Sequence, residues 1–146
     1  MIANKEKSIN LEFKIHSIEL IEKSFQTANM LGDKLPDTQF ELPISLSIDE
    51  LNRRIINLLN VKVKSTADNS IVATITVVCS FDITNFQEVV IISGDSVTLP
   101  DPIINTLNII TIGTTRGIMF SEFKGTWLHN NLLPVIDPKS FKQAKE

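Results

Sequence analysis

The sequence predicts an α+β domain in which antiparallel strands come first and one long helix follows. Two observations support this prediction. Between Phe13 and Phe81, apolar residues alternate with polar ones at a period of two, which is typical of half-buried strands. From about Pro102 to Lys124, apolar residues recur instead at helical spacing. Strands followed by one long helix favour a sheet that the helix covers on one side.

The composition is that of an ordinary globular domain. The 146 residues are 42% hydrophobic and 21% charged, with a net charge of −3, and this length can bury a core of its own. A mildly acidic chain without basic clusters disfavours nucleic acid as a partner, because phosphate binding depends on Lys and Arg. The single cysteine, Cys79, excludes an intramolecular disulfide. The N-terminus has no apolar signal segment, so we expect a cytoplasmic protein.

The first two predicted strands differ in regularity. The first runs from Phe13 to Phe25, with a change of parity near His16 and Ser17 that indicates an irregularity. The second alternates cleanly over Phe40–Ile48, where Pro43 predicts an edge strand or a bulge.

A hairpin follows these two strands. Its first strand includes Leu59 to Val63, its turn covers residues 67–70, and its second strand spans Ile71–Phe81. Residues 49–57 fit either a helical turn or a loop, and residues 84–99 show only a weak pattern.

The long helix has recognisable ends. Asp101 is a suitable N-cap, Pro102 suits the first helical position, and Gly125 is a suitable stop. Three polar residues, Asn105, Asn108 and Arg116, interrupt its apolar run, so we expect no membrane span.

The apolar residues of this helix go most of the way round it, which predicts burial on more than one side. The sheet can cover one side, but the rest of the chain offers little helix to cover the other. We therefore expect self-association through this helix, where two glycines four positions apart let another backbone come close. The residues assigned to this interface are Ile103, Leu107, Ile110, Gly113, Gly117 and Phe120.

No group of residues predicts an enzyme. His16 and His129 lie far apart, and neither has ligand-type neighbours at metal-site spacing. Cys79 falls on the apolar parity of a strand, which indicates a buried inert thiol. The sequence contains no phosphate-binding glycine loop and no nucleophile elbow. We expect no catalytic residue, no metal site and no cofactor.

Several motifs, in order and spacing, resemble the SecB preprotein-export chaperone family. The resemblance divides the chain into a flexible segment 1–10, a SecB-like domain 11–141 and a short tail 142–146. The segments that carry it are Phe13–Ile18, Ser24–Phe25, Gln39–Leu46, Leu59–Ser80, Gly125–Trp127 and Leu132–Val135.

The resemblance implies a four-stranded antiparallel sheet with a long C-terminal helix packed on one face, assembled as a dimer or a dimer of dimers. It also implies a chaperone that uses no ATP and no cofactor, and that holds non-native polypeptides in apolar grooves. The residues that match the family's grooves are Leu42, Ile44, Leu46, Trp127 and Phe141.

The family docks the SecA motor on an acidic face of the sheet. Glu22 matches one of the docking acids, whereas the matching positions further on hold Gln26 and Thr76. The missing acids weigh against SecA docking and leave two hypotheses. One is a general SecB-like chaperone, with a role in protein export. The other is a dedicated binding protein for one partner, such as an antitoxin, or for an apolar ligand.

Overall fold

The computed structural model describes residues 10–26, 37–131 and 133–135. The predicted end segments, 1–10 and 142–146, lie almost entirely outside these residues. In chain order the elements are β1 (Phe13–Phe25), β2 (Thr38–Glu41), β3 (Ile44–Asp49), β4 (Arg54–Ser65), β5 (Ile71–Ile83), α1 (Phe86–Val89), β6 (Ile91–Ser93), β7 (Ser96–Thr98) and α2 (Asp101–Glu122).

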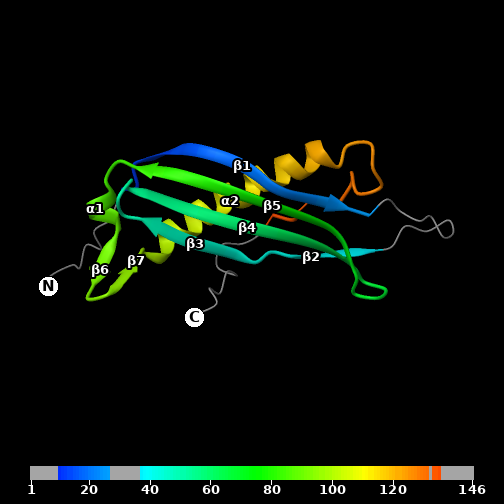
Figure 1. The fold of residues 1–146 in the computed structure, drawn as a ribbon, viewed down its shortest axis with the longest axis horizontal. Helices are drawn as coiled ribbons and strands as arrows, with labels where there is room; N and C mark the ends of the chain where they lie inside the picture. The colour runs from blue at the N-terminus through cyan, green and yellow to red at the C-terminus, as the bar shows by residue number, and fades with distance from the viewer. Residues whose placement is uncertain (1–9, 27–36, 132, 136–146) are drawn as a thin grey trace, which may run out of the picture.

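One antiparallel sheet runs in the order β1, β5, β4 and then β2 with β3 (Figure 1). β2 and β3 pair with β4 in one register, since Glu41 lies opposite Lys62 and Ile44 lies opposite Leu59. They are therefore one edge strand, interrupted where Pro43 has no N–H to donate. The predicted α+β fold, with four strand positions and a long helix on one face, is confirmed. Pro43 marks an edge strand, and the alternative of a bulge is wrong.

The core lies between α2 and the two central strands, β4 and β5 (Figure 1). Alternate residues of β4 from Ile55 to Val63 are buried on this side, as expected for a strand with one face against a helix. Ile103 and Leu107 of α2 also belong to this core, with exposed fractions of 5% and 0%. Both were assigned to an oligomer interface from the sequence. The structure corrects that assignment, because they are buried inside their own chain.

The ends of α2 agree only partly with the prediction. Asp101 is the first helical residue and Pro100 is the N-cap without a side-chain hydrogen bond, so the predicted capping role of Asp101 is wrong. Pro102 lies in the first turn, where its missing N–H costs no helical hydrogen bond. Gly125, with a φ of +82°, follows the helix as the predicted stop.

The remaining strand predictions are refined rather than overturned. β1 shifts register against β5 between Ile15 and Ser17, as the parity change predicted, and again between Leu20 and Glu22. The ambiguous residues 49–57 form a turn and then the start of β4. Residues 84–99 contain α1 and the small β6–β7 hairpin, which turns at Gly94 with a φ of +60°.

Candidate functional site

A row of exposed apolar side chains lies on the edge strand β1. Ile15, Ile18 and Leu20 stand opposite the buried Phe81, Cys79 and Val77 of β5. Directly opposed residues share one face of a sheet, so these three side chains face the side that carries α2. They are nevertheless 46%, 45% and 37% exposed, because α2 packs on β4 and β5. We call these three residues the β1 row.

The backbone of β1 is open beside this row. Within the described residues, β1 pairs only with β5, so the N–H and C=O groups on its other side have no partner strand. Such an edge can take up an extended chain by adding it as a further strand. Strand addition beside exposed apolar side chains is a means of binding an extended, apolar polypeptide.

The sequence-based groove residues do not gather in one place. Leu42, Ile44 and Leu46 are half-buried along the opposite edge of the sheet and pack against the core. Trp127 is half-buried near the end of β1, where its Nε1 donates to the carbonyl of Gln26 at 3.0 Å. Phe141 lies outside the described residues.

The outward side of α2 keeps four of the six predicted interface residues accessible. Ile110 and Gly113 are half-buried, and Gly117 is exposed. A Cβ atom added at Gly117 would meet no atom within 4 Å. Phe120 is 50% exposed, and its ring centroid lies 5.1 Å from that of His129. Within the described residues, this side of the helix therefore has accessible surface for contact with another molecule.

Glu22 lies on the other face of the sheet from the β1 row. Its register partner is Thr76, whose hydroxyl donates to the Glu22 carboxylate at 3.3 Å. Thr76 is one of the two positions where the resemblance would require an acid. Glu22 therefore lies beside a threonine at the position where the resemblance would require a second acidic residue.

A charged cluster on the same face joins three strands. Arg54 Nε donates to Asp82 Oδ1 at 2.8 Å, and His16 Nδ1 lies 3.3 Å from Asp82 Oδ2. The hydrogen bond from Arg54 lowers the pKa of Asp82 below its ordinary value of 3.8, and the charge of His16 adds to this effect. No group of three His, Cys, Asp or Glu residues in the described parts of the chain could hold a metal ion.

Replacing Asp82 with asparagine is expected to change how stability depends on pH. Because the pKa of Asp82 is lowered by folding, its carboxylate stabilises the fold above its ordinary pKa, and this contribution is lost as pH falls through the lowered value. Asp82→Asn should be less stable than the wild type in urea at pH 7, and the difference should shrink toward pH 2. Asp95→Asn, which removes an equal charge in the exposed β6–β7 turn, is the matched control. A pH-independent difference for Asp82→Asn would contradict the prediction.

Buried polar side chains connect α2 to the sheet. Asn57 is fully buried, and its Nδ2 donates to Asn108 Oδ1 at 3.2 Å and to Thr111 Oγ1 at 3.0 Å. Asn57 Oδ1 has no hydrogen-bond partner. These bonds favour one position of the helix along the sheet, because any sliding would leave more buried polar groups unpaired. The cluster has a structural role and contains no titratable group.

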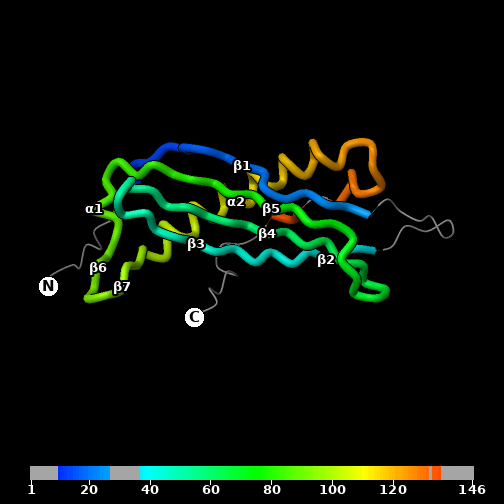
Figure 2. The backbone as a smooth tube through the Cα atoms, in the orientation of Figure 1, coloured from blue at the N-terminus to red at the C-terminus, as the bar shows by residue number. Residues whose placement is uncertain are grey.

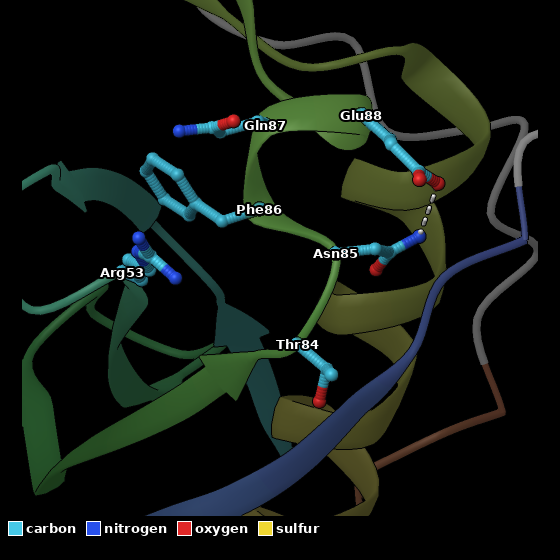
Figure 3. Close-up of a pocket in the computed structure, with 6 residues that line it drawn as sticks. All are labelled: Arg53, Thr84, Asn85, Phe86, Gln87 and Glu88. Carbon is cyan, nitrogen blue, oxygen red and sulfur yellow. Dashed lines mark hydrogen bonds between the residues drawn. The ribbon is translucent and has the colours of Figure 1, made fainter.

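A small cavity of about 200 Å³ lies where β5 leads into α1 (Figure 3). Its lining is polar around Phe86, with Arg53 on one side and Asn85 and Glu88 on the other. Asn85 already forms hydrogen bonds to the residues before β1. Its Oδ1 accepts from the Glu12 backbone amide at 3.0 Å, and its Nδ2 donates to the carbonyl of Asn10. These polar groups tie the start of β1 to the end of β5, and they form no nucleophile–base pair.

No protein-family model matches this chain, and no curated protein matches it in sequence. The fold is similar to a solved structure of the Mycobacterium tuberculosis SecB-like chaperone Rv1957, bound to a ChAD peptide from the HigA1 antitoxin. The TM-score is 0.56 at 9% sequence identity, and the match covers 86% of this chain and 88% of that chain. The two chains therefore share a fold. Within the described residues, no helix is long and apolar enough to cross a membrane.

Proposed function

We propose that this chain is a SecB-like chaperone that binds non-native polypeptides without ATP. The observation that carries the proposal is the β1 row beside an open strand edge, on a fold similar to that of a SecB-like chaperone. A client buries its own apolar side chains on this surface. Each large side chain contributes about 1.5–3 kcal/mol when it leaves water.

The half-buried residues of the opposite edge, Leu42, Ile44 and Leu46, provide a second apolar contact area in this proposal, with Trp127 near the end of β1. Self-association through the outward side of α2 would bring several such areas together. Several weak contacts on one oligomer then add through their high effective concentration. Many weak contacts suit a protein that binds varied unfolded chains rather than one shape.

Dedicated binding of one partner is the second candidate function. It is favoured by the similar solved chaperone, which is bound to a peptide from an antitoxin. Docking of SecA forms no part of either proposal, because Gln26 and Thr76 stand where the family has acids. Capture from native lysate distinguishes the two candidates, since one dominant partner favours dedicated binding and a broad set of clients favours a general chaperone.

The general function is tested by the aggregation of a thermally unfolding reporter enzyme, followed by light scattering. We expect a several-fold molar excess of the wild type to suppress aggregation. The triple variant Ile15→Thr, Ile18→Thr, Leu20→Thr should lose most of this effect, because threonine keeps strand propensity but removes apolar surface. Unchanged aggregation with the wild type would count against the proposal.

The matched control variant removes exposed apolar side chains outside the β1 row. Ile71, Ile91 and Ile92 are 44%, 48% and 65% exposed and lie outside the β1 row. Their triple replacement by threonine should suppress aggregation as well as the wild type does. Equal losses in both triple variants would show that general hydrophobicity, and not the β1 row, holds the client. The molar mass of each variant shows whether the row also contacts another copy of the chain.

A further inference from the structure

The segment Leu133–Val135, after α2, has no regular secondary structure, and its residues differ sharply in burial. Figure 2 shows that the chain turns back after α2 and returns toward the middle of the sheet, on the side of the helix. Leu133 is only 2% exposed and belongs to the core, whereas Val135 is 93% exposed. One leucine side chain therefore anchors an otherwise superficial segment.

Arg116 of α2 holds the backbone of this segment. Its Nε donates to the carbonyl of Leu133 at 2.7 Å, and its Nη2 donates to the carbonyl of Pro134 at 2.8 Å. Both acceptors are main-chain groups, which every polypeptide has. The fork of guanidinium donors therefore holds two consecutive main-chain carbonyls at once.

These contacts need nothing specific to this segment except a leucine-sized side chain. We propose that Arg116 and the site filled by Leu133 bind a polypeptide segment with a leucine-sized apolar residue, and that residues 133–134 occupy this site until such a segment displaces them. The inference rests on the proposed function, for which it names a second binding site and its regulation. It is separate from the β1 row, because no residue is shared.

Because residues 133–134 already fill the site, any other ligand must compete with them for it. A ligand binds only the fraction of molecules in which Leu133 has left, so its apparent affinity falls in proportion to that fraction. Weakening the anchor while keeping Arg116 should therefore strengthen binding. A segment that merely completes the core would show no such gain.

The experiment uses the full-length chain and a fluorescein-labelled peptide of its own residues 130–137. Binding is measured by fluorescence anisotropy for the wild type, Leu133→Asn and Val135→Asn. We expect Leu133→Asn to bind the peptide at least about tenfold more tightly than the wild type, as follows from freeing a site for one leucine side chain. Val135→Asn should match the wild type. Equal affinity in all three proteins overturns the inference.

Two further measurements distinguish binding at this site from non-specific hydrophobic binding. The same peptide with leucine 133 replaced by asparagine should bind the Leu133→Asn protein at least about tenfold more weakly. Adding Arg116→Lys to that protein should weaken its binding of the original peptide by a similar factor, because lysine cannot donate to both carbonyls from one planar group. If either change leaves the affinity unaltered, the inference is overturned.

Folding of each variant is checked by circular dichroism and by the fluorescence of Trp127, the only tryptophan. If Leu133→Asn does not fold, Leu133→Ala takes its place with the same expected direction. The triple variant of the β1 row should bind the peptide as the wild type does. If the wild type failed to suppress aggregation while the peptide still bound Leu133→Asn as expected, the result would count only against the proposed function. If the wild type suppressed aggregation but the peptide did not bind Leu133→Asn more tightly, the result would count only against this site.

Discussion

Replacing Leu107 with alanine is expected to lower the free energy of unfolding by about 2–5 kcal/mol. Leu107 is fully buried between α2 and the sheet, so the substitution removes apolar contacts and leaves a cavity in the core. Chemical denaturation at several protein concentrations measures the effect. Because the contacts of Leu107 lie within one chain, we expect the loss to be the same at every concentration.

The matched control is the same substitution at an exposed position. Leu51 is 91% exposed, and Leu51→Ala should change stability by no more than about 0.5 kcal/mol. A loss for Leu107→Ala that grows on dilution would instead mean that Leu107 stabilises an oligomer. That result would restore the interface role first assigned to it from the sequence.

Placing glutamate at Gly117 is expected to dissociate the proposed oligomer without unfolding the chain. Gly117 is exposed on the outward side of α2, and a Cβ atom there would meet nothing within 4 Å. Within one chain, loss of a helical glycine should raise stability by up to about 1 kcal/mol. In an oligomer packed through this side, each copy would bury an unpaired charge, which is strongly unfavourable. Light scattering coupled to size exclusion should show the mass falling to that of the single chain.

Gln87→Glu adds the same charge at an exposed position in α1, away from the outward side of α2. This control should keep the mass of the wild type. An unchanged mass for Gly117→Glu would exclude this side of α2 as the interface. A wild type that is already a single chain at micromolar concentration would exclude the oligomer itself, and would weaken the chaperone proposal that depends on it.

The strands and the helix could be predicted because their signals are local. Alternation from Phe40 to Ile48 survives in the structure as one face directed at α2, even though Pro43 interrupts the strand. The parity change near His16 corresponds to a real shift in register. Residues 84–99 were missed because α1, β6 and β7 are each only three or four residues long, too short for a periodic pattern.

The candidate site could be predicted only in part, because exposure depends on which strands the helix covers. The isoleucines of β1 have the same alternation as buried strand residues, and nothing local marks them as uncovered. Asn108 similarly counts in the sequence as an interruption of an apolar helix. In the structure it accepts a hydrogen bond from Asn57, which lies 51 positions earlier.

By itself, the sequence determined the fold class, the order of the long strands and the long helix, an irregular position at Pro43 and the apolar character of α2. These depend on periodicity and on the backbone chemistry of proline and glycine. Only the tertiary structure decided that α2 buries Leu107 against β4 and β5, leaves Ile18 of β1 exposed, and holds Leu133 through Arg116. The physical reason is that one helix cannot cover a four-stranded sheet, and its placement depends on packing between residues far apart in the chain.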